Sequence, residues 1–156
     1  MVKDLGDFSV GVAAFPEGHR QAASLDADAA VMRAKADAGA DFAITELFFR
    51  PADYVALVER SSAAGAAMPI IPGIMPITNL GQIQRFAELS GRQVPAEVVR
   101  RFDGVTDPAD VRTVGIAVAT EMCAELLRQG APGLHFYTLN RSTATREIYA
   151  NVVPVS

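Results

Sequence analysis

The sequence predicts an α/β fold built around a parallel sheet, and three observations support this prediction. Four short runs of β-branched, aromatic and aliphatic residues alternate along the chain with segments of helical pattern. The runs do not alternate cleanly between polar and apolar positions, which is typical of strands covered on both faces in parallel sheets. Helical segments also end repeatedly at a glycine just before a run. The four runs are 8–16, 41–49, 68–76 and 133–139.

The first half of the chain contains two strand–helix units. The run 8–16 is followed by a helix that Asp26 can cap and that runs to about Ala38. The run 41–49 is followed by a helix that starts at Pro51, because proline fits the first turn of a helix. That helix is expected to reach about Ala64.

The second half continues the pattern with more helices. After the run 68–76, Asn79 is expected to cap a helix through Leu89, and a shorter helix is expected over 94–102. Asp107 and Pro108 open a long helix through Arg128, whose apolar residues recur at steps of three or four. A last helix starts near Ser142, after the run 133–139.

The junctions between helices and runs repeat. The tripeptides AGA at 38–40, AGA at 64–66 and QGA at 129–131 each place a glycine where a helix ends. A repeated βα unit implies parallel strands with right-handed crossovers, and residues 1–156 form one domain because no long linker interrupts them. Four units are half of a β/α barrel, whereas a doubly wound sheet could use four or five. No G-x-G-x-x-G phosphate loop is present.

Composition excludes several function classes. The net charge of −4 and the pI of about 5.1 do not suggest nucleic-acid binding. No run of 18 apolar residues and no signal peptide is found, so we expect no membrane association and a cytoplasmic location. Cys123, the only cysteine, is expected to be an inert buried thiol. The two histidines are far apart, so no metal site is expected.

Polar side chains follow the expected strands at their carboxyl ends, where sites form in parallel α/β folds. Glu17 and His19 follow the first run, Glu46 lies near the end of the second, and Arg141 follows the fourth. Each also has a plainer interpretation. Glu46 could be an ion-pair partner of Arg50 or Arg141, and His19 alone could be a surface histidine.

Several motifs, in the same order and at matching intervals, resemble the methylenetetrahydrofolate reductase family over nearly the whole chain. They are AAFPEGH at 13–19, DAGADFAIT at 37–45, IIPGIMPITN at 70–79, RFDG at 101–104 and HFYTLNR at 135–141. The resemblance implies a TIM-type (β/α)8 barrel that holds FAD and uses NADH or NADPH as co-substrate. This chain, with four to five βα units, corresponds to strands five to eight of that barrel.

The resemblance also implies cofactor-binding residues. Phe15 stands where the family usually has a tyrosine that contacts FAD, and it lacks the hydroxyl group. His19 and Ala22 match positions that contact FAD after the same strand. Asp28 and Lys35 match positions that hold the adenosine and diphosphate end. A lysine near a diphosphate is physically sensible because a point charge suffices there.

Four further residues match positions that bind substrate in the family. Gln82 and Arg141 match folate contacts, and Phe86 matches an aromatic residue that stacks on the nicotinamide cofactor, although core packing would also explain Phe86. Glu46 occupies the position of a substrate-recognising glutamine. A glutamine both donates and accepts hydrogen bonds, whereas an ionised glutamate only accepts.

The resemblance implies flavin-dependent reduction of 5,10-methylenetetrahydrofolate to 5-methyltetrahydrofolate, in a barrel completed by a partner. The family's general-acid glutamate lies in the first half of the barrel, which this sequence does not match. No catalytic residue is therefore assigned here, although Glu17 or Glu46 could substitute as the acid if one reached the substrate nitrogen. The expected partner is the missing N-terminal half or a second copy of this chain. The alternatives are a non-catalytic half-barrel fragment or assembly module and, more distantly, an unrelated α/β-barrel lyase.

Overall fold

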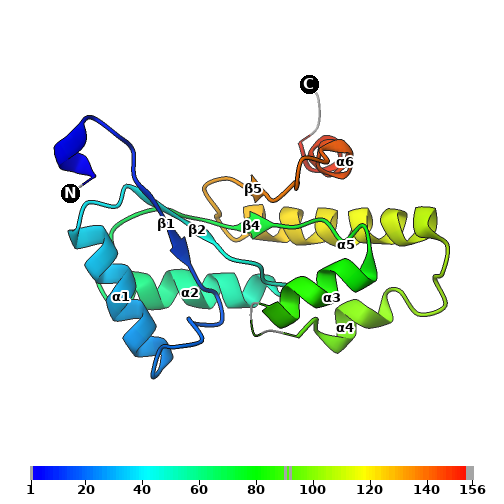
Figure 1. Cartoon of the computed structure of the whole chain (residues 1–156), viewed down its shortest axis with the longest axis horizontal. Helices are drawn as coiled ribbons and strands as arrows, with labels where there is room; N and C mark the ends of the chain where they lie inside the picture. Colours follow the sequence, from blue (N-terminus) through cyan, green and yellow to red (C-terminus); the bar gives the residue numbers. More distant parts are fainter. Residues whose placement is uncertain (1, 90, 92, 154–156) are drawn as a thin grey trace.

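The computed structural model describes residues 2–89, 91 and 93–153 of the chain as a mixed α/β arrangement of short parallel strands with helices packed around them (Figure 1). The chain begins with a short 3-10 helix, Lys3–Leu5. The strands are β1 Gly11–Ala14, β2 Phe42–Thr45, β3 Ile70–Ile71, β4 Gly73–Ile74 and β5 His135–Phe136. The helices are α1 Leu25–Asp37, α2 Pro51–Ala63, α3 Leu80–Leu89, α4 Ala96–Arg100, α5 Pro108–Arg128 and α6 Thr143–Val152.

All strand pairs in the described chain are parallel, as the sequence predicts. One sheet has the order β1-β2-β3, and β4 pairs with β5 in a second sheet. The run 68–76 was expected to be one strand, but Pro72 divides it into β3 and β4. Proline cannot donate a ladder hydrogen bond, so the sheet changes partner there: Ile70 pairs with β2, whereas Gly73 pairs with β5.

The helices begin close to where their capping residues predict. Pro51 and Pro108 occupy the first turns of α2 and α5, and the Asp107 carboxylate accepts a hydrogen bond from the Ala109 backbone N–H. The predicted cap of α1 is wrong by two residues. Ser24 is the cap, because its hydroxyl accepts a hydrogen bond from the Ala27 N–H, and Asp26 lies inside the first turn.

Two clusters of buried side chains form the core. The larger one contains Met32 of α1, Leu57 of α2 and Leu126 of α5, and it joins these helices to the strands. Cys123 belongs to this cluster and is fully buried, so the prediction that its thiol is buried is confirmed. Burial raises the pKa of the thiol to about 12, and its inertness stays a prediction. The second cluster lies around Ile77 and connects α3, α4 and α5.

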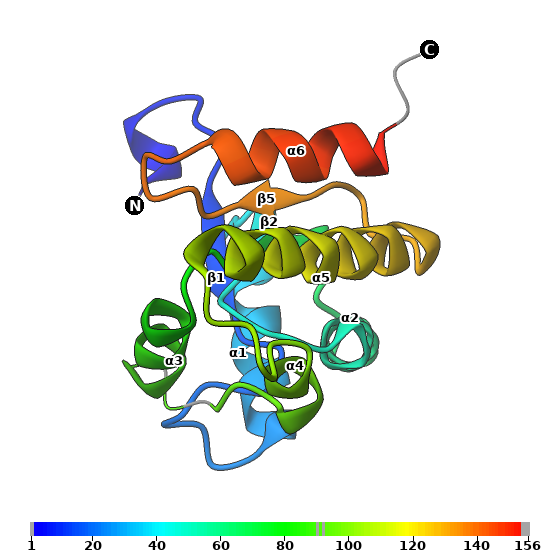
Figure 2. The ribbon, with the colours of Figure 1, turned by 90° about the vertical axis from the view of Figure 1, so that its right-hand side faces the viewer.

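Helices α5 and α6 pack against each other, and Figure 2 shows α6 lying on the far side of α5 from α2 and α4. The strand faces are less covered than their apolar sequences predict. In β1, Ala14 is fully buried while Gly11 and Ala13 are exposed. The expectation of strands covered on both faces is therefore wrong for β1.

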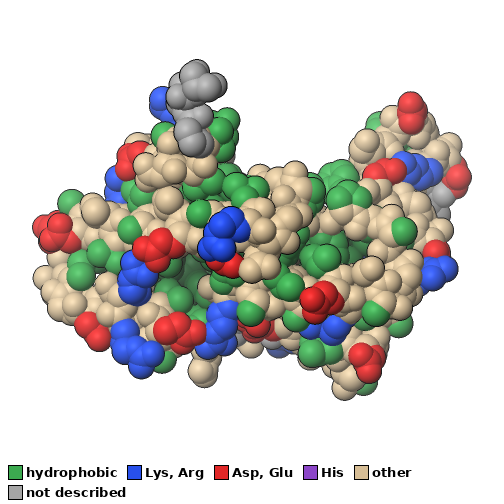
Figure 3. Space-filling view, turned by 180° about the vertical axis from the view of Figure 1, so that it is seen from behind, with side chains coloured by type: hydrophobic (Ala, Val, Ile, Leu, Met, Phe, Trp, Pro, Cys, Tyr) green, Lys and Arg blue, Asp and Glu red, His purple; other side chains and the backbone are tan. Residues whose placement is uncertain are grey.

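The surface carries charges of both signs. Figure 3 shows acidic and basic side chains interspersed on one face, with hydrophobic side chains at the floor of its hollows. Of the two basic residues at 100–101, Arg101 makes a bidentate ion pair with Glu121 at 2.8 and 2.9 Å. In the part of the chain that the structure describes, no helix has the length and apolar character to cross a membrane.

Candidate functional site

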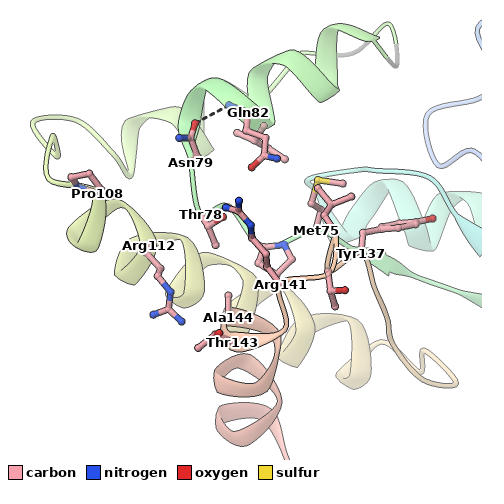
Figure 4. A pocket seen from close by; sticks show the side chains of 14 residues that line it. Met75, Thr78, Asn79, Gln82, Pro108, Arg112, Tyr137, Arg141, Thr143 and Ala144 are labelled. Atoms are coloured by element: carbon pink, nitrogen blue, oxygen red, sulfur yellow. Dashed lines mark hydrogen bonds between the residues drawn. The ribbon is translucent and has the colours of Figure 1, made fainter.

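A cavity of about 520 Å³ lies at the carboxyl ends of β4 and β5 (Figure 4). The segments that leave the two strands form its walls together with the first turns of α3, α5 and α6. Most of its side chains are polar, and two are arginines. The lining residues are Met75, Pro76, Thr78, Asn79, Gln82, Ile83, Pro108, Arg112, Tyr137, Thr138, Leu139, Arg141, Thr143 and Ala144.

Gln82 and Arg141 come from segments almost sixty residues apart and line the same cavity. Gln82 lies in the first turn of α3, which Asn79 caps as predicted: the Asn79 side-chain oxygen accepts a hydrogen bond from the Gln82 N–H at 2.9 Å. This cap uses the Asn79 side-chain oxygen and the Gln82 backbone N–H, so the Gln82 side-chain amide can face the cavity. Figure 4 shows the Arg141 guanidinium beside Thr78, on the side of the cavity below α3.

The turn that carries Arg141 is held in an uncommon conformation. Leu139 and Asn140 both have positive φ, at 49° and 63°. Asparagine tolerates this left-handed region, but leucine adopts it at a cost of about 1 kcal/mol or more. The Arg141 N–H donates a hydrogen bond to the Thr138 carbonyl at 2.8 Å, which closes the turn. Strain and hydrogen bond together fix where the arginine enters the cavity.

Arg112 lies at the other end of the cavity and already has a partner. Its guanidinium donates two hydrogen bonds to the Glu147 carboxylate, at 2.6 and 3.1 Å. This pairing raises the pKa of Arg112 and lowers the pKa of Glu147. Because Glu147 neutralises Arg112, Arg141 is the cation that keeps its charge available among the described residues that line this cavity.

Tyr137 is a site residue that the sequence analysis did not single out. Its ring lines the cavity and its hydroxyl donates a hydrogen bond to the Thr45 carbonyl of β2 at 2.9 Å. The ring passes so close to Gly73 that a Cβ there would lie 2.6 Å from it. Burial, with a contribution from the nearby charge of Glu46, raises the pKa of Tyr137. The hydroxyl is therefore a neutral donor at physiological pH.

A second, smaller cavity of about 200 Å³ lies at the carboxyl ends of β1 and β2. Phe15, His19 and Glu46 all line it, so three predicted residues meet there. The His19 ring stands edge-on to the Phe15 ring, with 4.6 Å between their centroids. The Glu46 side chain is exposed rather than buried in the strand. The ion pair with Arg50 is not formed, because Arg50 instead binds Glu97 at 2.6 Å.

Three other predicted cofactor residues surround this cavity without lining it. The Asp28 carboxylate is buried and accepts a hydrogen bond from the His19 backbone N–H at 3.2 Å. The Ala22 N–H donates to the His19 carbonyl at 2.8 Å. The Lys35 ammonium donates to the Ala13 carbonyl at 2.7 Å and lies 5.9 Å from the centre of the Phe15 ring.

Phe86 does not line either cavity. It is partly buried and packs against the core cluster around Ile77, one turn along α3 from Gln82. This position agrees with core packing, the plainer of the two interpretations of Phe86 that the sequence left open. In the described residues, no three His, Cys, Asp or Glu side chains gather in a way that could hold a metal ion.

The sequence predicts that the polar side chains lie at the carboxyl ends of the strands. In the structure they line two separate cavities at that end. A signal for Tyr137 existed in the sequence: an aromatic residue with a hydroxyl lies near the carboxyl end of the run 133–139. The bidentate pair of Arg112 and Glu147 gave no signal, because the partners lie 35 residues apart on different helices.

Comparison with known proteins shows what this chain is similar to. The chain is 41% identical over 143 residues to the 5,10-methylenetetrahydrofolate reductase of Escherichia coli K12, covering 91% of this chain and 48% of that protein. It is 42% identical over 143 residues to a probable methylenetetrahydrofolate reductase (NADPH) of Caenorhabditis elegans, covering 90% of this chain and 22% of that protein. The chain therefore spans about half the length of the bacterial relative.

A solved structure shares the fold at low sequence identity. It is an uncharacterized Clostridium thermocellum protein whose description says that it binds two copies of 5-methyl-5,6,7,8-tetrahydrofolic acid. It superposes with a TM-score of 0.64 at 16% identity, covering 94% of this chain and 53% of the other. The family model described as methylenetetrahydrofolate reductase matches residues 1–153, and it confirms the resemblance found in the sequence motifs. This chain belongs to the methylenetetrahydrofolate reductase family.

Proposed function

We propose that this chain forms half of a flavin-dependent reductase that converts 5,10-methylenetetrahydrofolate to 5-methyltetrahydrofolate with NADH or NADPH. The observation that carries the proposal is the convergence of Gln82 and Arg141 on one cavity at the carboxyl ends of β4 and β5. The family resemblance in the sequence implies that both positions contact folate, independently of their place in the fold. Family membership and the curated relatives' names support the same reaction.

The architecture proposed is one domain, residues 1–156, corresponding to strands five to eight of a TIM-type (β/α)8 barrel. Its support is the parallel order of the strands, with β3 and β4 acting as one strand interrupted at Pro72. When β3 and β4 are counted as one strand, the chain contributes four parallel strands, and a closed barrel needs eight. The fold shared with about half of a folate-binding protein agrees with this interpretation.

The larger cavity is the proposed folate site. Arg141 provides an uncompensated guanidinium, which suits a carboxylate of the substrate's glutamate group because the two can form parallel charge-assisted hydrogen bonds. The Gln82 amide can both donate and accept, which suits the mixed polar edge of a pterin. Met75 and Pro76 supply apolar surface in the same cavity.

Glu46, which lines the smaller cavity, is the proposed specificity residue. Its exposed carboxylate can accept two hydrogen bonds from a pterin edge that offers two N–H donors. It cannot donate to a carbonyl while it is ionised, so it cannot reproduce every contact of the family's glutamine. The general acid that protonates the substrate nitrogen is proposed to come from the other half of the barrel, since no residue of either cavity is assigned to it.

The residues around the smaller cavity fit FAD in their chemistry. An aromatic ring, an imidazole and an ammonium group, from Phe15, His19 and Lys35, lie together at the end of β1. FAD, when bound, supplies the hydride chemistry that links the nicotinamide to the folate methylene group. Asp28 departs from the expected direct contact: its buried carboxylate orients the His19 loop, which is an indirect role. Ala22 contributes through the same loop, and Phe86 would serve the nicotinamide only if its ring left the core.

The cofactor proposal is tested with the visible absorption spectrum of the purified chain after incubation with FAD and removal of free flavin by size exclusion. We expect flavin to elute with the protein. Colourless protein would contradict cofactor binding by this half alone, and the non-catalytic half-barrel would become the better description. The elution volume also reports whether the chain has associated.

The folate proposal is tested by titrating the chain with 5-methyltetrahydrofolate. We expect Arg141→Met to weaken binding by roughly ten- to a hundredfold, the equivalent of losing a charged hydrogen bond of about 1.5–3 kcal/mol. Arg146→Met is the matched control, because Arg146 is exposed on α6 and lies outside the cavity. Equal affinities for the two variants would refute the assignment of Arg141.

The role of Glu46 requires a completed barrel, obtained by adding the missing N-terminal half. In that assembly, Glu46→Gln is expected to raise both folate affinity and the rate of folate reduction, because an amide restores the missing donor. If neither changes, Glu46 does not read the substrate.

A further inference from the structure

We propose that Arg60, in the last turn of α2, is a positioning residue that holds the loop between β1 and α1 in the shape that forms the smaller cavity. The inference rests on the proposed function, in which this cavity holds FAD. It adds a residue that the sequence motifs did not single out and that acts from outside the cavity, because Arg60 does not line it.

The loop between β1 and α1, residues 15–24, makes most of the smaller cavity. It supplies five of the seven described residues that line this cavity, whereas Glu46 and Leu47 follow β2. The loop also orients the imidazole of His19, whose Nδ1 accepts a hydrogen bond from the Gln21 backbone N–H at 3.2 Å. In a neutral ring the proton then lies on Nε2, which can donate to a ligand. The cavity keeps this shape and this donor only while the loop stays in place.

Two charged side chains attach the loop to helices. The buried Asp28 carboxylate of α1 accepts the His19 N–H, but α1 directly follows the loop, so this contact is local. The Arg60 Nη2 of α2 donates to the Pro16 carbonyl at 2.8 Å, across 44 residues of sequence. Helix α2 belongs to the strand–helix unit that carries Glu46 at the end of its strand. Arg60 therefore joins the two walls of the cavity, the loop on one side and the end of β2 on the other.

The surroundings of Pro16 make this contact important for the loop. Pro16 is buried, and a buried carbonyl that loses its donor is strongly disfavoured. Without the guanidinium, the loop would have to shift until the carbonyl reached water. The hydrogen bond is also charge-assisted, which makes it stronger than one between neutral groups. Because surface loops open at little cost, its loss should leave a large fraction of chains with the loop displaced.

Hydrogen exchange of the chain without flavin tests the positioning role. We expect Arg60→Met to speed exchange of the amides of residues 17–22 about tenfold or more, while α5 keeps its protection. Arg60→Lys should restore most of this protection, because an ammonium can donate to a single carbonyl. Arg33→Met is the matched control: Arg33 lies on the neighbouring α1 and binds Asp37, so its loss should not change the loop. If Arg60→Met does not fold by circular dichroism, Arg60→Gln also removes the charge and should speed loop exchange likewise.

Titration of the same variants with FAD tests the consequence for binding. We expect Arg60→Met to raise the FAD dissociation constant about threefold or more, because apparent affinity falls with the fraction of chains whose loop is in place. Arg60→Lys should raise it less than about twofold, and Arg33→Met should leave it unchanged.

The proposal is overturned if Arg60→Met leaves loop exchange unchanged, or if it speeds exchange equally throughout the chain, which would make Arg60 a support of the core. It is also overturned if the variant and the unsubstituted chain bind FAD equally well. If the unsubstituted chain binds no FAD, the cofactor proposal fails by itself. Faster loop exchange in Arg60→Met would then still support the role of Arg60, and unchanged exchange would still refute it.

Discussion

Gly115 lies in the middle of α5, and adding a single methyl group there should strongly destabilise the folded chain. Alanine is normally the better helix former by about 1 kcal/mol, so helix propensity alone predicts that Gly115→Ala stabilises the protein. Packing predicts the opposite. A Cβ at Gly115 would overlap the Ile77 carbonyl oxygen and lie 2.7 Å from the Ile77 carbonyl carbon, where ordinary contact begins at 3.4 Å.

No flexible side chain can move to relieve this overlap, because the added Cβ is fixed to the helix backbone and meets the backbone of Ile77. Helix α5 and the segment after β4 must separate by at least about 0.7 Å, which opens the core cluster around Ile77. Overpacking of this kind costs about 1–3 kcal/mol and occasionally more. We expect a net loss of about 3 kcal/mol because the site cannot yield at a flexible side chain. For a chain of this length, that lowers the Tm by about 6–12 °C.

Thermal and urea unfolding followed by circular dichroism measure this loss. Gly81→Ala on α3 is the matched control, since its Cβ would meet only the Asn79 side-chain oxygen at 3.5 Å, an ordinary contact. That variant should be as stable as the unsubstituted chain or more stable by up to about 1 kcal/mol. A Gly115→Ala variant that is equally stable or more stable would refute the close approach of α5 to Ile77.

Three further predictions follow from single contacts. Ser24→Ala should cost about 1 kcal/mol in urea unfolding, whereas Asp26→Asn should have little effect, because Ser24 is the cap. Cys123, with its pKa raised to about 12, should react with a thiol reagent at pH 8 only after urea is added; rapid reaction of the folded chain would contradict its burial. Arg112 lowers the pKa of Glu147 below its ordinary value of 4.5, so their pairing stabilises the fold above that pH and is lost as pH falls through the lowered pKa. The Tm of Glu147→Gln should therefore depend less on pH between 3 and 5; identical profiles would exclude this contribution.

Local signals in the sequence predicted much of the fold. Helix starts at Pro51 and Pro108, and the caps at Asn79 and Asp107, were predicted because each depends on residues within one turn. The parallel order of the strands followed from the repeated helix, glycine and apolar run. The extent of the strands did not, because a strand is defined by its partner. Pro72 shows this, since an apolar run of nine residues became two short strands.

The candidate site divides in the same way. The sequence by itself determined which polar residues follow the strands, and the family motifs singled out Gln82, Arg141 and Glu46 among them. Only the tertiary structure decided how they are grouped: Arg141 joins Gln82, and Glu46 joins the separate cavity of Phe15. These groupings depend on contacts between segments tens of residues apart, which no local pattern encodes.

The same limit applies to the charged side chains. The sequence contains Glu46, Arg50 and Lys35, but the tertiary structure determines which groups they contact. Arg50 binds Glu97, and the Lys35 ammonium donates a hydrogen bond to the Ala13 carbonyl of β1. Local sequence determined the elements because turns, caps and periodicity act over a few residues. The tertiary structure decided the site because ion pairs and close backbone contacts exist only once distant elements have packed.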